Sequence, residues 1–304
     1  MVYSKNTDSS NVIYSKFFEK IMKSRFVFTF EVGCLRGFTI RSILKNIGKV
    51  ERFFDAFVVP DNPFAKVFPH PLALCDKIRR ESSADVVMTI CCRDKNRLAI
   101  QSEVLGAELL DIRNIVVVTG DPLSESDGIK NVFDVNSIQA IKMIKNMITQ
   151  GNISNKLGTG ERLKLHVGAV VNLSSRNLEE EVEKFFMKID AGAEYAFTQI
   201  VFDPNLLVEF KDNVGKIPIP VIVSIYPITS WEQMCFLTSF SSFEIPPQTI
   251  AYFRQKRRDT DMGVKEALNI AFKAKELGFN GIHIVCKNVN LTVKLVKRLK
   301  EEVS

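Results

Sequence analysis

Eight short apolar runs, rich in valine, isoleucine and phenylalanine, constrain the fold of this chain more than any other feature. The segments between them, such as 136–148 and 177–192, carry apolar residues at helical spacing. Strands that alternate with helices in this way predict parallel strands buried on both faces and joined by right-handed crossovers. Eight such units favour a closed (β/α)8 TIM barrel over an open doubly wound sheet. The eight runs are residues 26–33, 54–61, 85–92, 114–121, 165–172, 195–203, 219–227 and 281–288.

The domain organisation follows from the same pattern. The chain has 304 residues, of which 46% are hydrophobic and 25% are charged, which is typical of a globular protein with a sizeable core. No low-complexity linker divides the runs, so we expect one barrel domain over residues 1–304. Residues 10–25 show a helical pattern before the first run, and we expect residues 1–25 to form an N-terminal helical extension.

Composition disfavours several classes of protein. The net charge is +6, but acidic residues are interleaved with basic ones, and the dense run 253–261 is interpreted as a solvated helix end; we expect no nucleic-acid partner. Six cysteines without a CxxC pattern and three scattered histidines indicate neither a metal site nor a disulfide framework. No stretch approaches the roughly 18 apolar residues of a membrane span. A reduced, cytoplasmic location is therefore expected.

Polar residues gather where the runs end. In a (β/α)8 barrel, catalytic groups collect at the C-terminal ends of the strands and in the loops that follow. Gln199 shows the pattern best, because burying it unpaired would cost roughly 1–3 kcal/mol, whereas at the barrel mouth its amide could bind a heterocycle. Each residue alone could be a loop cap or a satisfied core group, but the joint pattern favours a site. The residues are Glu31, Asp61, Asn62, Thr89, Cys91, Arg93, Asp94, Thr119, Asp121, Asn172, Gln199, Asp203, Tyr226, Lys287 and Asn288.

Three groups of residues admit both a chemical and a structural interpretation. Glu31 follows aromatic and β-branched residues, so desolvation should raise its pKa and make it a candidate general acid; the alternative is an ion pair with an arginine or lysine inside the barrel. Gly120 and Asp121 could meet a cofactor ring, or form a plain turn. Glu181, Lys184 and Lys188 share a helix face that is either solvated or close to a diphosphate.

Several motifs together resemble the methylenetetrahydrofolate reductase family. They are "FTFEVG" (28–33 within the first run), "VVVTGDP" (116–122), "VFDVNS" (132–137), "DAGAEYAFTQIVFD" (190–203) and "GIHIV" (281–285), in this order. The resemblance covers roughly residues 26–290, and the fourth motif is its most specific part.

The resemblance implies a flavin-dependent (β/α)8 oxidoreductase. Such an enzyme reduces 5,10-methylenetetrahydrofolate to 5-methyltetrahydrofolate, with FAD as cofactor and NADH or NADPH as electron donor. By resemblance Glu31 is the general acid, Asp121 lies between flavin and pterin, and Gln199 binds the pterin. Gln233 matches a further substrate-contacting glutamine. The positions that the resemblance assigns to flavin contacts are Pro60, Thr89, Thr119, Gly120, Phe133, Val170, Glu181, Lys184 and Lys188.

Four of these positions depart from the family pattern. Thr89 stands where a histidine is common, Thr119 replaces an arginine, Val170 a tyrosine and Pro60 a threonine. The catalytic positions match the family pattern, while several flavin-contact positions differ. The sequence therefore leaves open FMN in place of FAD, a weakly held flavin, another electron donor, or a modified pterin as substrate.

The expected partners are a folate-type pterin substrate and further copies of the chain in a homo-oligomer. Two alternatives to the reductase remain. One is a pterin-binding subunit that docks on a corrinoid methyltransferase or an electron-transfer protein. The other is a non-redox (β/α)8 lyase in which Glu31 and Asp121 act as acid and base.

Overall fold

The structure is a computed structural model that describes residues 12–33, 40–122, 128–151, 162–240 and 243–303. Eight parallel strands pair in chain order and close into a barrel, with β8 paired to β1. The predicted (β/α)8 barrel is confirmed, and each strand lies within one of the eight apolar runs. The strands are β1 (Val27–Glu31), β2 (Ala56–Val59), β3 (Asp85–Cys91), β4 (Asn114–Val118), β5 (His166–Val171), β6 (Tyr195–Val201), β7 (Val221–Ile225) and β8 (Gly281–Ile284).

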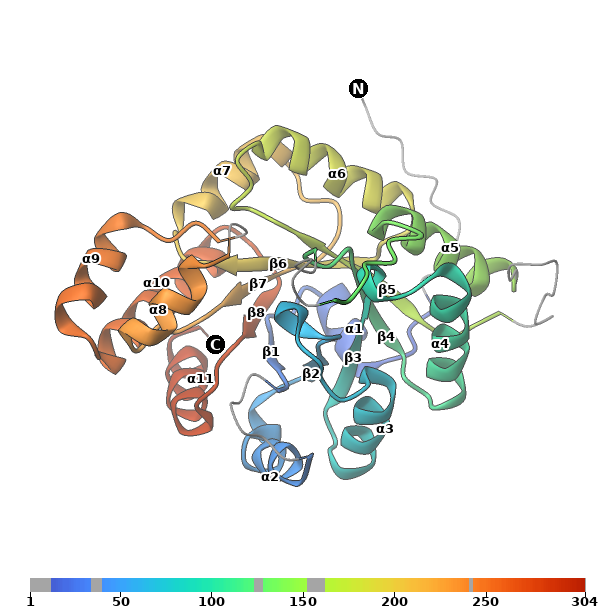
Figure 1. Cartoon of the computed structure of the whole chain (residues 1–304), viewed down its shortest axis with the longest axis horizontal. Coiled ribbons are helices and arrows are strands. Elements are labelled where there is room, and N and C mark those ends of the chain that lie inside the picture. The colour runs from blue at the N-terminus through green and yellow to red at the C-terminus, as the bar shows by residue number, and fades with distance from the viewer. Residues whose placement is uncertain (1–11, 34–39, 123–127, 152–161, 241–242, 304) are drawn as a thin grey trace.

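Helices surround the barrel (Figure 1). They are α1 (Lys16–Met22), α2 (Ile40–Val50), α3 (Pro71–Glu81), α4 (Arg97–Leu109), α5 (Ser137–Gln150), α6 (Leu178–Asp190), α7 (Asn205–Val214), α8 (Trp231–Thr238), α9 (Pro247–Lys256), α10 (Thr260–Glu276) and α11 (Val289–Val303). The sequence pattern suggested one helix after each strand, but three helices, α8 to α10, separate β7 from β8. The run 253–261 lies at the exposed end of α9 and the turn into α10, as predicted. Within the described ranges, none of the helices is long and apolar enough to cross a membrane.

Side chains alternate between the inside of the barrel and its helical coat, as the two-residue period of a strand requires. Val27 of β1, Val87 of β3 and Tyr195 of β6 belong to the inner cluster near the N-terminal ends of the strands. The position four residues further along β1 faces the same way, one layer higher, and is Glu31. The strand period therefore brings Glu31 to the C-terminal mouth, while Gln199 lines the same cavity at an irregularity in the pairing of β6 with β7.

Helix α1 covers the opposite, N-terminal end of the barrel. Its Phe17, Phe18 and Ile21 are fully buried against the inner cluster. Phe18 stacks on the ring of His166, with ring centroids 3.5 Å apart. The helix begins after Ser15, whose side chain caps it and also donates to Asn114. Of the predicted extension over 1–25, the described residues 12–25 contain one helix at 16–22, and residues 1–11 lie outside the described ranges.

Candidate active site

A cavity of about 550 Å³ opens at the C-terminal ends of the strands. This is the position at which (β/α)8 enzymes place their active sites, and the volume is that of a small-molecule site. Most of the residues that the sequence singled out line this cavity. They are Glu31, Pro60, Asp61, Asn62, Thr89, Cys91, Arg93, Thr119, Gly120, Asp121, Val170, Asn172, Glu181, Lys184, Lys188 and Gln199.

Two predicted ligand contacts lie outside the cavity wall. The Gln233 amide oxygen accepts hydrogen bonds from the main-chain N–H of Thr229, at 2.8 Å, and from its hydroxyl, at 3.0 Å, so it fixes the start of α8. Phe133 lies exposed on the loop before α5. Five polar residues expected at the strand ends also do not line the cavity, and they are Asp94, Asp203, Tyr226, Lys287 and Asn288.

Among the described residues, Glu31 of β1 faces a histidine of β8. Its Oε2 lies 3.6 Å from Nε2 of His283, and the Glu31 side chain is 19% exposed. Nδ1 of His283 lies 3.0 Å from the hydroxyl of Thr29. The carboxyl is thus held in the cavity wall beside the imidazole ring of His283.

Gln199 lies at an irregularity in β6. The pairing of β6 with β7 shifts register between Phe197 and Ile200, and such bulges redirect side chains near active sites. Oε1 of Gln199 accepts from the N–H of Ile200 at 3.1 Å. Since that bond uses the carbonyl oxygen, the amide NH2 is the part of Gln199 that can donate to a ligand.

The loop after β4 brings Thr119, Gly120 and Asp121 to the rim. Gly120 has φ +87°, and a Cβ at this position would lie 2.4 Å from Sγ of Cys91. Only glycine combines this backbone conformation with such close packing. Burial raises the pKa of Cys91 to about 11, so its thiol stays protonated at neutral pH. Cys91 therefore serves as a packing surface for the loop, not as a thiolate nucleophile.

The rim between β5 and α6 carries the lysines. Nζ of Lys188 donates to the main-chain oxygen of Val170 at 2.7 Å and lies 3.4 Å from Glu181 Oε1. Burial lowers the pKa of Lys188, which is 8% exposed. Lys184 is more exposed and pairs with Glu180 at 2.6 Å. Lys188 thus mainly holds α6 against β5, while Lys184 is the cation that a ligand at the rim could reach.

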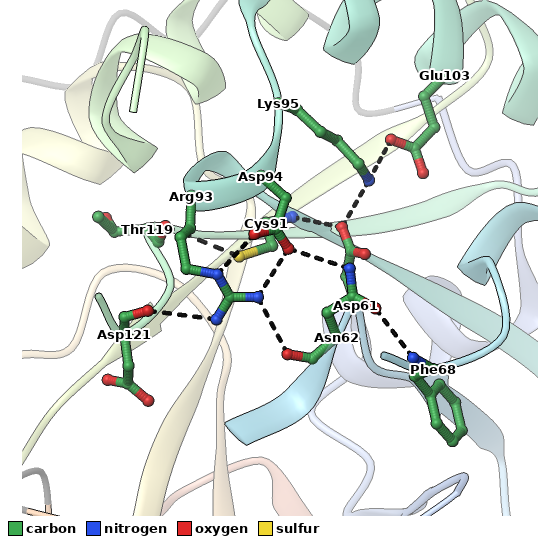
Figure 2. A network of polar contacts seen from close by, with 10 residues as sticks. All are labelled: Asp61, Asn62, Phe68, Cys91, Arg93, Asp94, Lys95, Glu103, Thr119 and Asp121. Atoms are coloured by element: carbon green, nitrogen blue, oxygen red, sulfur yellow. Dashed lines mark hydrogen bonds and ion pairs between the residues drawn. The ribbon is translucent and has the colours of Figure 1, made fainter. Parts of the chain in front are cut away.

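Charged residues after β2 and β3 form a connected network (Figure 2). Nζ of Lys95 lies 2.6 Å from Asp61 and 2.6 Å from Glu103, and all three side chains are largely buried. Burial disfavours the ammonium, but the two carboxylates outweigh it and raise the pKa of Lys95. Asp61 also accepts from the N–H of Cys91 at 2.8 Å. These contacts tie the end of β2 to the end of β3 beneath the cavity.

Sequence reasoning assigned no role to His283, and it treated Arg93 only as one of many polar strand ends. His283 is 4% exposed and Arg93 2%, and both line the cavity. A polar residue within the apolar run 281–285 was the available signal for His283. No local pattern shows that Arg93 reaches two neighbouring loops.

Comparisons with known proteins agree with this geometry. A sequence model of the methylenetetrahydrofolate reductase family matches residues 16–300. Methylenetetrahydrofolate reductase 1 of Schizosaccharomyces pombe is 22% identical over 72% of this chain and 36% of its own length, so the chain spans about a third of that relative. The 5,10-methylenetetrahydrofolate reductase of Buchnera aphidicola subsp. Acyrthosiphon pisum is 26% identical over 47% of this chain and 44% of its own length.

A solved structure shares the fold. It is an uncharacterized protein from Clostridium thermocellum described as binding two copies of 5-methyl-5,6,7,8-tetrahydrofolic acid. It aligns with a TM-score of 0.68 and 16% identity, over 93% of this chain and 98% of its own. Because the family model spans nearly the whole barrel and the residues that carry the resemblance converge on one cavity, the chain belongs to the methylenetetrahydrofolate reductase family.

Proposed function

We propose that this protein reduces 5,10-methylenetetrahydrofolate, or a closely related methylene-pterin, to the 5-methyl form. A bound flavin and NADH or NADPH would supply the electrons. The observation that carries the proposal is the convergence of Glu31, Asp121 and Gln199 on one cavity in a member of this family. The fold relative that binds 5-methyltetrahydrofolic acid supports the choice of substrate class.

The residues at the rim fit a flavin. Helix α5 begins at the cavity, with Asn136, Ser137 and Ile138 in its wall, and the N-terminus of a helix favours a diphosphate. Lys184 would add a positive charge, and the main chain at Gly120 would lie against the flavin ring. When bound, the flavin supplies the hydride that reduces the methylene carbon. The cavity also admits FMN, so we propose a flavin with FAD as the first choice.

The chain's own residues would handle the proton and the orientation of the substrate. Glu31 would donate a proton to the ring nitrogen that leaves when the five-membered ring of the substrate opens. His283 would hold the Glu31 carboxyl in place, and water entering the open cavity would return a proton to the carboxylate after the reaction. The NH2 group of Gln199 would donate to the pterin and fix its plane. Asp121, whose side chain is exposed at the rim, would complete the polar contacts around the pterin.

An anaerobic titration tests this function. The purified protein is titrated with FAD and FMN, and the absorbance change reports binding; reduction of the bound flavin by NADH and NADPH is then followed, and methylenetetrahydrofolate is added. Reoxidation of the flavin with formation of 5-methyltetrahydrofolate is the expected result. A protein that binds methylenetetrahydrofolate but takes up neither flavin would instead favour a pterin-binding subunit, and one that binds neither ligand would exclude the proposal.

A further inference from the structure

Arg93 joins three consecutive loops of the barrel mouth. It follows β3 in the short 3-10 turn Cys92–Asp94, and its Nε and Nη2 donate to the two carboxylate oxygens of Asp94, each at 2.7 Å. Nη2 also donates to the main-chain oxygen of Asn62, after β2, at 3.1 Å. Nη1 donates to the main-chain oxygen of Asp121, after β4, at 3.3 Å. One buried side chain therefore links the loops after β2, β3 and β4.

The main chain of Arg93 holds the same loop from a second side. Its N–H donates to the oxygen of Thr119 at 2.9 Å, and its oxygen accepts from the N–H of Val132 at 2.8 Å. A Cβ at Gly120 would lie only 2.9 Å from Cβ of Arg93. The segment 119–121 is thus fixed by Arg93 on both sides of Gly120.

The contacts with Arg93 engage the main chain of Asp121, so the Asp121 carboxylate can face the cavity. In Figure 2 the Asp121 carboxylate points away from the Arg93 guanidinium, which reaches only its main-chain oxygen. Asp94 balances the guanidinium charge, and this hydrogen-bonded pairing raises the pKa of Arg93. Asp121 is exposed, so its own surroundings do little to orient it. Its position depends on the contacts that its main chain makes with Arg93.

We propose that Arg93 is a positioning residue that sets the place of Asp121 for binding and reduction of the pterin. This inference rests on the proposed function. Arginine is required because its planar fork can bind Asp94 with two parallel hydrogen bonds and still reach Asn62 and Asp121, which the single ammonium of a lysine cannot do. Arg93 would thereby act on the folate half-reaction and leave reduction of the flavin by the nicotinamide largely untouched.

A double-mutant cycle between Arg93→Lys and Asp121→Asn tests the proposal in the flavin-loaded enzyme. Stopped-flow measurement of Arg93→Lys should show about a tenfold slower folate half-reaction and a nicotinamide half-reaction within about twofold of the unmutated rate. In a protein that already carries Asp121→Asn, adding Arg93→Lys should slow the folate half-reaction by less than about a further twofold. Calorimetry with 5-methyltetrahydrofolate should show the same non-additivity in binding affinity, which is a readout independent of turnover.

Two further variants test whether the effect of Arg93→Lys reflects a general loss of structure. Arg97→Lys is the matched control, because the ion pair of Arg97 with Asp134 at 3.1 Å also links two segments, the start of α4 and the loop before α5, but Arg97 is exposed and does not line the cavity. Its two half-reactions should stay within about twofold of the unmutated rates. If Arg93→Lys does not fold, Asp94→Asn loosens the same guanidinium and should slow the folate half-reaction selectively.

The outcomes separate this inference from the proposed function. Equal losses in both half-reactions, or effects of Arg93→Lys and Asp121→Asn that multiply, would show that Arg93 serves only the stability of the barrel mouth. An unmutated protein that folds and binds flavin but does not reduce the folate would overturn the proposed function, and the role of Arg93 with it.

Discussion

Oε2 of Glu31 lies 3.6 Å from Nε2 of His283, and this contact joins the first and the last strand of the barrel at the cavity wall. The two residues are 252 positions apart in sequence, and only closure of the barrel between β1 and β8 makes them neighbours. Because His283 is itself bound to Thr29, the histidine ring is fixed before any ligand arrives. The carboxyl of Glu31 is therefore held at a defined place in the cavity wall.

Glu31→Gln should separate the two half-reactions. Opening of the substrate's five-membered ring needs a proton on the departing nitrogen, whereas reduction of a flavin by a nicotinamide does not. The glutamine keeps the shape of the side chain but supplies no proton, and loss of a general acid typically costs about 100- to 10,000-fold. Stopped-flow measurement should show folate reduction nearly abolished and flavin reduction within a few-fold. Folate reduction that persists at the unmutated rate, in a protein shown to be folded by circular dichroism, would make Glu31 a packing residue.

Gln199→Ala should weaken only the steps that involve the pterin. The substitution leaves a buried polar edge of the pterin without its partner, which costs about 1–3 kcal/mol of substrate stabilisation. It also frees the N–H of Ile200, so the melting temperature is measured as a control for damage to the β6 bulge. The KM for methylenetetrahydrofolate should rise while flavin reduction is unchanged. Equal damage to both half-reactions would indicate a structural role instead.

Gly120→Ala should lower activity by more than the strain of its positive φ angle alone would cause. Holding a non-glycine residue at φ +87° costs roughly 1–3 kcal/mol, and the added Cβ must also displace Cys91 and Arg93. Gly128→Ala is the control, since Gly128 has φ +66° but nothing within 4 Å of the added atom. Chemical denaturation and folate reduction are measured for both. We expect at least a tenfold loss of activity for Gly120→Ala and little loss for Gly128→Ala; similar losses in the two variants would contradict close packing at Gly120.

Glu194 should make the N-terminal end of the barrel sensitive to acid. Burial disfavours its charge, but the hydrogen bond with His166 and the charge of Lys145 outweigh burial and lower the pKa of Glu194 below the ordinary value of 4.5. A carboxyl with a lowered pKa in the native state binds fewer protons there than in the unfolded state. Its contribution to stability is therefore complete above pH 4.5 and is lost as the pH falls through the native value.

The comparison of Glu194→Gln with the unmutated protein tests this pH dependence. The unfolding free energy should differ by about 1–3 kcal/mol at pH 7, the range for hydrogen bonds to charged groups. The difference should shrink as the pH falls below 4.5, because protonation removes the charge that the variant already lacks. Urea titrations at several pH values measure it. A difference that stays constant down to pH 3 would show that the Glu194 charge does not stabilise the native state.

The sequence by itself determined the eight strands, their order and their alternation with helices, but not the three helices between β7 and β8. The runs around Glu31 and Gln199 are long enough and apolar enough to be strands, and both polar side chains stand near the ends of their runs. The rule that active sites lie at the C-terminal ends of barrel strands then predicted a site at the end of the barrel where the cavity lies. The strand predictions held because they depend on local periodicity.

Only the tertiary structure decided which side chains meet. Gln233 and Phe133 were expected at the ligand, but Gln233 is engaged at the start of α8 and Phe133 lies outside the cavity wall. The pairing of Glu31 with His283 and the reach of Arg93 to Asp121 depend on barrel closure and on loop conformation. Each of these two contacts joins residues from different strands or loops over a few ångströms. Strand periodicity predicts which face a side chain occupies, but not which side chain or main-chain group it contacts. The sequence could therefore place the site at the mouth of the barrel, while the partners within it had to come from the folded chain.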